Sequence, residues 1–379
     1  MRRLIPLLEG RCPPRGWMER TFLNLLGMAG VGYGWVQAGR THLYRRGWLT
    51  RWQGACPVIS VGNLTAGGTG KTPMVAWLGR YFLDRGIPLA IVSRGYRQRS
   101  RAPITLVANR EQRILDAPEA ADEAVLLAQE LPGAVVLTGP DRRRLIHHAT
   151  HHLGCRLILM DDGFQQVPVY RDLDLVLLDA RHPWGNGRIL PGGVLREFPR
   201  AIGRADGIIF TRAGNEFDPV AAGVMIQRHA PGIPIAHCHH EPLHWIEAAK
   251  GVQHPLDTLR HRKVLAFCGI GQPESFRMVL RDLSLDLVDF EIFPDHHAIT
   301  SEQWRSLATK AHILGATALV TTQKDLVKIH VGVTTPPLFA LAVGIRFPHP
   351  PSWLLQRLEH LVFMIKKNGQ DAIPDTPFP

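Results

Sequence analysis

Cysteine is scarce in this 379-residue chain, and no two of its cysteines form a C-x-x-C pair. The five are Cys12, Cys56, Cys155, Cys238 and Cys268. Such scattering excludes a disulfide framework and favours reduced thiols in a cytosolic compartment. Histidines gather around one cysteine, at His237, His239, His240 and His244. Because no second cluster lies at ligand spacing, we expect exposed histidines at a strand end and no structural zinc site.

Internal repeats and low-complexity tracts are also absent. With 45% hydrophobic and 20% charged residues, the composition is that of an ordinary globular protein, and the length allows two domains. Acidic residues are outnumbered, 33 against 44 basic ones, which gives a net charge of +11. The excess predicts an anionic partner: nucleic acid, anionic lipid or a phosphorylated substrate. No nucleic-acid recognition motif is present, so we expect no nucleic-acid partner.

Charged residues are missing from one apolar stretch, residues 21–39. Asn24, Gln37 and five glycines weaken it as a membrane span, and arginines flank it on both sides. Its aromatic residues and those nearby suit the headgroup depth of a membrane: Trp17, Phe22, Tyr33, Trp35, Trp48 and Trp52. We therefore expect residues 1–50 to form a membrane-associated stem with an interfacial helix. A buried core helix is the alternative, and a cleaved signal peptide is disfavoured.

Short apolar runs alternate with helix-length segments after the stem. This alternation predicts an α/β fold with a P-loop-type parallel sheet flanked by helices over residues 51–215. A second series of apolar runs predicts a smaller α/β domain over residues 216–365, and residues 366–379 form a tail. Ligands of such sheets bind at the carboxyl ends of the strands.

A glycine-rich loop follows the first of these strands, in the segment PVISVGNLTAGGTGKTP from Pro57 to Pro73. Strand, glycine loop and helix start in this order form a phosphate cradle, so we expect a nucleoside triphosphate to bind here. The predicted nucleotide-binding residues are Thr65, Ala66, Gly67, Gly68, Thr69, Gly70, Lys71 and Thr72. Thr65 stands where the G-x-x-x-x-G-K-[ST] pattern has its first glycine. A glycine turn without a ligand is the alternative.

Carboxylates follow another predicted strand, where Asp161 and Asp162 end the run RLILM. This is where a nucleotide-binding sheet needs a magnesium carboxylate, although an exposed acidic turn has the same pattern. Asp122 and Glu123 lie in a helical-looking segment, and a solvated helix face is their default interpretation.

Arginines in loops are candidates for phosphate contacts, because their forked side chains match phosphate oxygens. The candidates are Arg94, Arg142 and Arg196, the last with Glu197 beside it. Taken singly, each is more often a surface arginine. In the second domain Asp295, His296 and His297 follow a strand, where a histidine oriented by a carboxylate is a candidate base or proton relay.

Taken together, these strings resemble one family, the tetraacyldisaccharide 4′-kinases. The matching strings are LYRRGWL, PVISVGNLTAGGTGKTP, SRGY, DDGFQ, RDLDLVLLDA, GNGRILPGGVLRE, AFCGIG, FPDHH and TQKD, across about residues 20–330. The loop with Thr65 is itself the family's form. The resemblance implies an ATP- and Mg²⁺-dependent kinase that phosphorylates the lipid A disaccharide precursor at the cytoplasmic face of the bacterial inner membrane. It implies a membrane glycolipid as the partner and no obligate protein partner.

Residue roles also follow from the resemblance. Lys71 and Thr72 are implied to bind phosphates and magnesium, with Asp161 and Glu123 as further metal ligands and Asp162 at the γ-phosphate. Asp122 is implied to be the base, paired with His296. Arg142, Arg196 and Glu197 fall on family positions near the phosphates. Four positions depart from the pattern: Ala121, Ala124, Gln166 and Gln323.

A rival hypothesis from another class is a nucleotide-driven membrane switch or partition-type ATPase, which would share the loop and the stem. Guanine recognition is disfavoured, because Lys324 and Asp325 are adjacent and no N-K-x-D motif occurs. A switch would hydrolyse nucleotide and phosphorylate no lipid.

Overall fold

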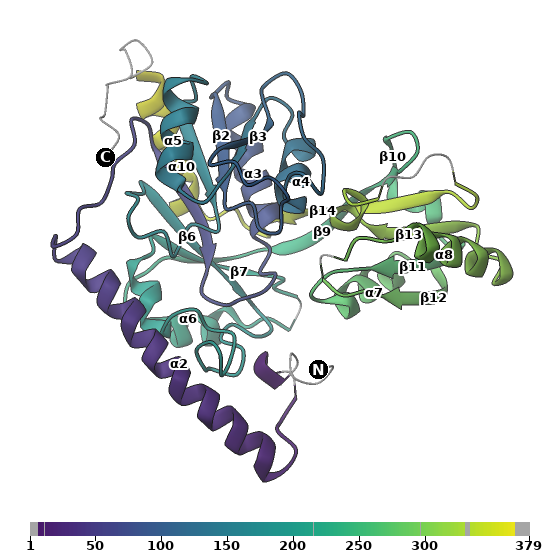
Figure 1. Ribbon diagram of the computed structural model, residues 1–379, viewed down its shortest axis with the longest axis horizontal. Helices are drawn as coiled ribbons and strands as arrows, with labels where there is room; N and C mark the ends of the chain where they lie inside the picture. The colour runs from purple at the N-terminus through teal and green to yellow at the C-terminus, as the bar shows by residue number, and fades with distance from the viewer. Residues whose placement is uncertain (1–6, 11, 215, 296, 330–333, 368–379) are drawn as a thin grey trace.

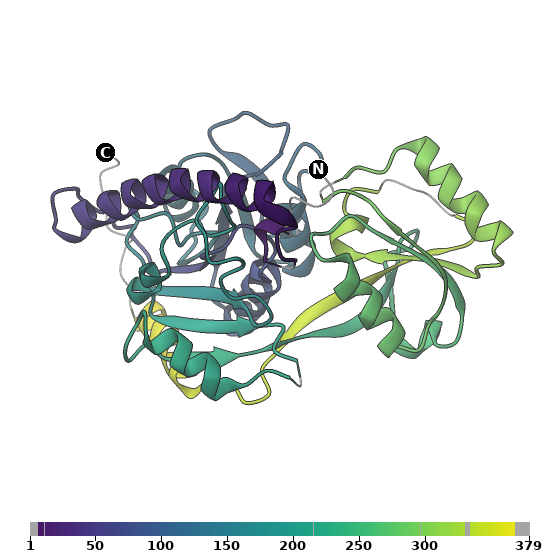
Figure 2. The same cartoon turned by 90° about the horizontal axis from the view of Figure 1, so that it is seen from below.

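The chain folds into two α/β units with a long N-terminal helix beside the first, as a computed structural model shows (Figure 1). The structure describes residues 7–10, 12–214, 216–295, 297–329 and 334–367. Turned by 90°, the N-terminal helix is seen to lie across one side of the first unit (Figure 2).

The first unit is built on an eight-stranded sheet with the order β3-β4-β2-β5-β1-β6-β7-β8. The strands are β1 Val58–Asn63, β2 Leu89–Ser93, β3 Thr105–Ala108, β4 Val135–Thr138, β5 Leu157–Asp161, β6 Leu173–Asp179, β7 Gly207–Thr211 and β8 Ile235–His237. Only β3 runs antiparallel to its neighbour within the described sheet. The central strand β1 lies between β5 and β6, so the ends of these three strands share one edge.

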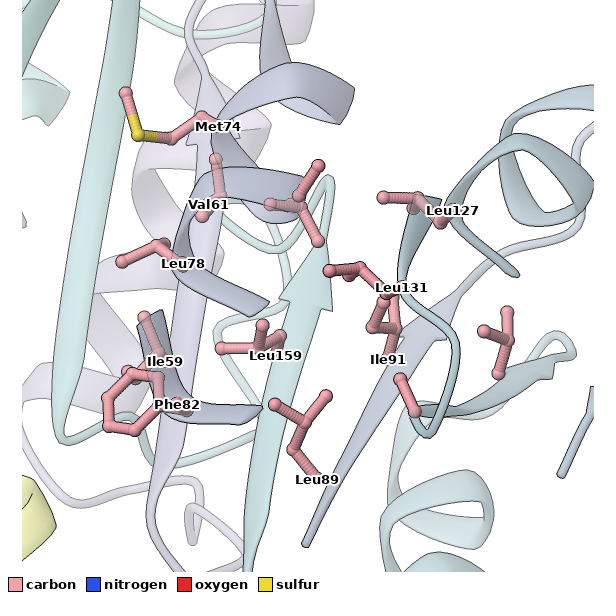
Figure 3. Packing of buried hydrophobic residues seen from close by; sticks show 14 of the residues in the cluster. Ile59, Val61, Met74, Leu78, Phe82, Leu89, Ile91, Leu127, Leu131 and Leu159 are labelled. Atoms are coloured by element: carbon pink, nitrogen blue, oxygen red, sulfur yellow. The ribbon is translucent and has the colours of Figure 1, made fainter. Parts of the chain in front are cut away.

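Both faces of this sheet are covered by helices, which is why its strands read as continuous apolar runs. The helices are α3 Lys71–Leu83, α4 Asp122–Glu130, α5 Arg142–His151, η1 Pro199–Arg204, α6 Pro219–Gln227 and α10 Ser352–Lys367. Side chains of β1 alternate between the faces. Ile59 and Val61 pack with Leu78 and Phe82 of α3 (Figure 3), whereas Val58 joins the cluster on the other face. The six residues of β1 are all buried.

The first unit does not end at the expected division between residues 215 and 216. Both α6 and β8 lie beyond that point, yet β8 pairs with β7 in the first sheet. The chain also returns to this unit near its C-terminal end, because α10 packs into the same core cluster as β1 and α3, through its apolar stripe Leu354, Leu358, Leu361 and Ile365. The spacing of that stripe requires a buried face but does not specify which sheet will cover it.

The second unit is a six-stranded sheet with the order β10-β9-β14-β13-β11-β12. Its strands are β9 His239–Glu247, β10 Val252–His254, β11 Lys263–Cys268, β12 Asp286–Ile292, β13 Ala318–Thr322 and β14 Leu338–Arg346, and its helices are η2 Leu256–Leu259, α7 Pro273–Asp282, α8 Ser301–Ile313 and α9 Gln323–Leu326. The antiparallel strands β9 and β14 connect the units, as Figures 1 and 2 both show. The predicted pair of α/β units is confirmed.

The stem forms one helix, α2 Gly16–Arg45. Its glycines make close packing possible: a Cβ atom on Gly30 would lie 2.4 Å from the carbonyl oxygen of Ile189, and one on Gly34 would lie 2.5 Å from the Ile189 side chain. Away from this contact, Trp17, Phe22 and other large apolar side chains are exposed. Among the residues described, no helix is both long enough and apolar enough to cross a membrane.

Candidate active site

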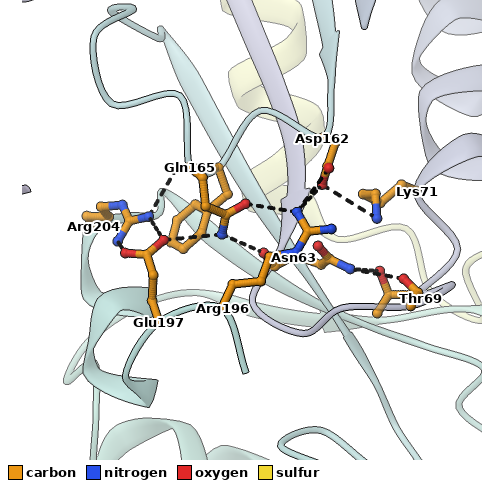
Figure 4. Close-up of polar contacts among 10 residues, drawn as sticks. Asn63, Thr69, Lys71, Asp162, Gln165, Arg196, Glu197 and Arg204 are labelled. Atoms are coloured by element: carbon orange, nitrogen blue, oxygen red, sulfur yellow. Dashed lines mark hydrogen bonds and ion pairs between the residues drawn. The ribbon is translucent and has the colours of Figure 1, made fainter. Parts of the chain in front are cut away.

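The glycine loop joins the end of β1 to the start of α3, as the sequence predicted. Gly67 and Gly70 adopt φ angles of 115° and 81°, a region that glycine enters without strain. Asn63 holds the loop from inside: its Nδ2 donates to the Thr69 Oγ1 at 2.9 Å and to the Gly67 carbonyl at 3.3 Å (Figure 4). The loop therefore curves around the N-terminus of α3, where backbone N–H groups can receive phosphate oxygens.

The backbone at Thr65 shows why glycine is not required at the first position of the G-x-x-x-x-G-K-[ST] pattern. It forms an antiparallel bridge with Leu195, an extended conformation that any L residue adopts. Next to it, the Ala66 N–H donates to the Val194 carbonyl at 2.6 Å. The segment around residues 189–196 thus lies against the glycine loop on one side, and Ile189 of the same segment contacts α2.

Lys71, Asp162 and Arg196 form a charged group at the mouth of the loop (Figure 4). The Asp162 carboxylate lies 3.6 Å from Lys71 Nζ, and its two oxygens accept from Arg196 Nη1 at 2.8 and 2.9 Å. Burial alone would raise the pKa of Asp162, but the positive charges of Lys71 and Arg196 outweigh it and lower that pKa. Asp162 is therefore held as an anion facing two cations.

Asp161 has the opposite environment, one residue earlier at the end of β5. It is 2% exposed, and burial, together with the negative charges of Glu123 and Asp162, raises its pKa to about 7. Lys71 and Arg142 oppose this rise without cancelling it. Its Oδ1 is buried and has no hydrogen-bond partner among the described residues.

These properties fit a magnesium ligand. A buried carboxylate oxygen without a donor, beside a second carboxylate, is stabilised by a divalent cation. Thr72, the second residue of α3, supplies a hydroxyl at the adjoining helix start. Within the described part of the chain, no three His, Cys, Asp or Glu side chains are placed to hold a metal together. The donor set suits Mg²⁺, which takes one or two carboxylates and completes its shell with phosphates and water.

Arg142 is a buried cation next to these aspartates. It begins α5 behind the N-cap Asp141, and its Nη1 donates to the Gly139 carbonyl at 2.7 Å. Burial lowers its pKa to about 10, and the charges of Asp162 and Asp161 partly restore it. Arg94 is exposed, but its charge also lowers the pKa of Arg142, so the two predicted arginines share one region.

Glu197 is not placed as the predicted phosphate contact would be, because its carboxylate faces Arg204 and not the glycine loop. Its carboxylate forms a buried ion pair with Arg204, with both N–O distances 2.7 Å. Gln165, which the sequence analysis did not select, connects this pair to the site: it donates to Glu197 at 3.2 Å and accepts from Arg196 at 3.2 Å (Figure 4). We expect Glu197 to orient Arg196 through Gln165.

Asp122 and Glu123 form the first turn of α4 and are half-buried. The charge of Glu123 raises the pKa of Asp161, so Glu123 faces the strand-end carboxylates, which overturns the default interpretation of this turn as a solvated helix face. The second unit approaches here, because Lys324 Nζ lies 3.4 Å from Glu123 Oε1 and 3.7 Å from Asp295 Oδ1. The predicted His296 lies outside the described residues.

Further residues that the sequence analysis missed lie on the opposite side of the loop, at the ends of β6 and β7. Thr211 Oγ1 donates to the Thr69 carbonyl at 2.8 Å, and Asp179 forms an ion pair with Arg212. Gln272 of the second unit donates to Asp179 at 3.0 Å. The strand-end rule that selected Asp161 could have found Asp179 and Thr211 too.

The four histidines in and near the β8–β9 connection are half-buried, contrary to the expectation that they would be exposed. The Nε2 atom of His240 is buried without a partner among the described residues, and a Cβ atom on Gly70 would lie 2.5 Å from it. Burial lowers the pKa of His240 to about 3, so this ring stays neutral beside the glycine loop.

Comparison with known proteins agrees with this geometry. The family model described as tetraacyldisaccharide-1-P 4′-kinase matches residues 22–361. A protein named tetraacyldisaccharide 4′-kinase from Syntrophus aciditrophicus is 39% identical over 323 residues, which cover 83% of this chain and 85% of that protein. One of the same name from Syntrophotalea carbinolica is 37% identical over 340 residues, 90% of this chain and 92% of that protein. The crystal structure of LpxK from Aquifex aeolicus in complex with ATP is 30% identical, with a TM-score of 0.72 over 91% of this chain and 99% of that one.

Proposed function

This chain belongs to the tetraacyldisaccharide-1-phosphate 4′-kinase family, and from that premise we propose how its residues carry out the family's reaction. The reaction is transfer of the γ-phosphate of ATP to the 4′-hydroxyl of tetraacyldisaccharide 1-phosphate, which gives lipid IVA in the synthesis of lipid A.

One observation carries the assignment. The glycine loop with Lys71, the strand-end pair Asp161 and Asp162, and the acidic first turn of α4 converge on one place between the two units. A kinase needs these three parts together: a phosphate cradle, carboxylates for the metal and a base for the acceptor. A site that only binds nucleotide has no use for the third.

Catalysis at such a site is mainly the stabilisation of charge on the transferring phosphoryl group. Loop N–H groups and Lys71 Nζ would hold the β- and γ-phosphates, and Arg196 and Arg142 would neutralise the equatorial oxygens. Magnesium would be held by Thr72, Asp161 and Glu123, and when bound it supplies positive charge that neutralises the phosphates. Asp162 holds Lys71 and Arg196 in place through the contacts described above.

The acceptor hydroxyl must lose its proton as its oxygen attacks the γ-phosphorus. Asp122 begins α4 next to Glu123, and we assign its carboxylate as the base that takes this proton, with His296 as its partner. The new P–O bond forms as the bond between the γ-phosphorus and the β–γ bridging oxygen breaks, and ADP leaves.

We further propose that α2 rests on the membrane that holds the lipid substrate. Trp17 is 74% exposed and Trp35 60% exposed, and the helix ends in basic residues. Exposed aromatic and basic side chains on one helix bind the headgroup region of anionic membranes. The enzyme would then work at the cytoplasmic face of the inner membrane, and flotation with lipid vesicles measures this association.

Asp122→Asn tests the role of the base, because asparagine keeps the size of the side chain but cannot take the proton. We expect turnover of lipid to fall by about 10²- to 10⁴-fold, with ATP binding unchanged. Glu119→Gln is the matched control, since Glu119 precedes the same helix and its side chain is 57% exposed. Near-normal turnover by folded Asp122→Asn would show that another group takes the proton.

A further inference from the structure

Lys324 is a cation of the second unit that lies among carboxylates of both units. Glu123 belongs to α4 of the first unit, and Asp295 follows β12 of the second. The ammonium group lies within 3.4 Å of the Glu123 carboxylate and 3.7 Å of the Asp295 carboxylate. It therefore links the first turn of α4, which begins with Asp122, to the turn at Asp295 in the second unit.

The backbone that carries Lys324 is firmly held. Its neighbour Asp325 is 3% exposed and accepts hydrogen bonds from Thr322 Oγ1 at 2.7 Å and from the Gly269 N–H at 3.0 Å. The other oxygen of Asp325 accepts from Lys328 Nζ at 2.7 Å. Because this network fixes the start of α9, the Lys324 side chain projects from a rigid point, which is what precise positioning requires.

Lys324 balances the negative charges of the carboxylates around it. The Glu123 and Asp295 carboxylates both lie within 4 Å of Lys324 Nζ, and the charge of Glu123 also acts on Asp161. Carboxylates this close repel one another unless a cation lies between them. The Lys324 ammonium is the positive charge that the structure places against both carboxylates, 3.4 Å from that of Glu123 and 3.7 Å from that of Asp295. Arg97 of the first unit supports the same junction, since its Nη1 donates to the Asp295 carbonyl at 3.2 Å.

We propose that Lys324 is a positioning residue for phosphoryl transfer, whose ammonium ties the start of α4, where Asp122 lies, to the Asp295 turn of the second unit and so fixes Asp122 relative to the acceptor. This role rests on the proposed function. Removing the cation leaves Glu123 and Asp295 to repel each other across the junction, so the two units part by a small distance. A displacement near 1 Å lowers the rate by about 10²-fold when reacting groups must be aligned.

Lys324→Met tests this role, with lipid phosphorylation measured at saturating ATP and lipid. We expect kcat to fall by about 10²-fold, while KM for ATP changes little because the glycine loop is untouched. Lys324→Arg should recover most of kcat, since a guanidinium can still reach both carboxylates. Lys310→Met is the matched control: it removes the same charge from the same unit, where Lys310 pairs with Asp289 and Glu291 on α8 and β12.

A second comparison separates positioning from a general loss of folding. If Lys324 acts through Asp122, then Lys324→Met should cost far less in an Asp122→Asn background than in the intact chain. Equal losses in both backgrounds, or an unchanged kcat in Lys324→Met, would overturn the positioning role while leaving the kinase assignment intact. An intact chain that phosphorylates no lipid would instead overturn the proposed function, and this role with it.

Discussion

Asp161 and Asp162 show how two neighbouring aspartates acquire different chemistry from their surroundings. Asp162 turns toward Lys71 and Arg196, and these cations keep its pKa low despite burial. Asp161 stays inside the strand end, where burial and the nearby carboxylates raise its pKa to about 7. Asp162 thus holds Lys71 and Arg196 in position, whereas Asp161 has the properties of a metal ligand.

The raised pKa of Asp161 predicts a pH-dependent stability in metal-free buffer. Its pKa is about 7 in the folded chain and about 3.9 when unfolded, so the folded state holds the proton more tightly. The stability from this group is complete below about pH 4 and is lost as the pH rises through about 7. Asp161→Asn does not lose this stability as the pH rises, because asparagine cannot ionise.

Thermal unfolding with a chelator present checks this prediction at pH 5 and pH 8. We expect Asp161→Asn to melt above the unsubstituted chain by a larger margin at pH 8 than at pH 5, by several degrees. Comparing the two chains cancels the titration of other groups. The same margin at both pH values would mean that Asp161 ionises normally in the fold.

The sequence pattern predicted where several of the candidate site residues lie, although not what contacts each of them makes. The positions of Asp161 and Asp162 were predictable because they lie at the end of a buried strand, and that of Lys71 because a glycine loop leads from a strand to the start of a helix. Glu197 was predicted as a phosphate contact, yet Arg204 pairs with it, a contact that no spacing in the chain reveals. Lys324 had no predicted role of its own beyond the family string TQKD and the missing guanine motif, because its partner Glu123 is 201 positions away.

Among the helices, α2 contains glycines whose role in packing could not be inferred from composition. Five glycines in an apolar run weakened the case for a membrane span. In the structure Gly30 and Gly34 let the helix approach the segment around Ile189 closely. That segment continues into Leu195 and Arg196, which contact the glycine loop and Asp162. The stem helix is thus packed one layer away from the phosphate site.

The exposed face of α2 gives a prediction about the membrane. Phe22, Leu25 and Met28 are 48, 56 and 65% exposed, so replacing all three with serine should leave thermal stability nearly unchanged. The same variant should lose most of its flotation with vesicles that contain phosphatidylglycerol, because burial of apolar side chains in the interface drives binding.

Gly32→Ala is the matched control for this experiment. A Cβ atom at Gly32 meets nothing within 4 Å, and alanine favours a helix over glycine by about 1 kcal/mol. The variant should float like the unsubstituted chain. Undiminished flotation of the triple serine variant would show that α2 is not the membrane contact.

For the whole molecule, alternating apolar runs predicted two α/β units correctly, because buried parallel strands and their covering helices leave a strong pattern. The boundary was harder to predict. β8 joins the first sheet after position 216 and α10 returns to its core near the end of the chain, so the second unit is an insertion in the first. Contacts across the junction, at Gln272 and Lys324, depend on this arrangement and could not be predicted from the sequence.

The basic charge of the chain was compatible with several anionic partners. The glycine loop and the stem were likewise compatible with a nucleotide-driven switch as well as with a kinase. A switch differs from a kinase only in what it does with the γ-phosphate. The product of ATP turnover therefore distinguishes the two, whereas nucleotide or membrane binding does not.

The most direct test follows labelled γ-phosphate from ATP to tetraacyldisaccharide 1-phosphate in detergent micelles, for the intact chain and for Lys71→Ala. Without Lys71 the phosphates lose the cation that Asp162 holds at the loop. We predict a bisphosphorylated lipid from the intact chain and almost none from the variant. Release of the label as free phosphate without a lipid product, or equal lipid product from both chains, would contradict the account.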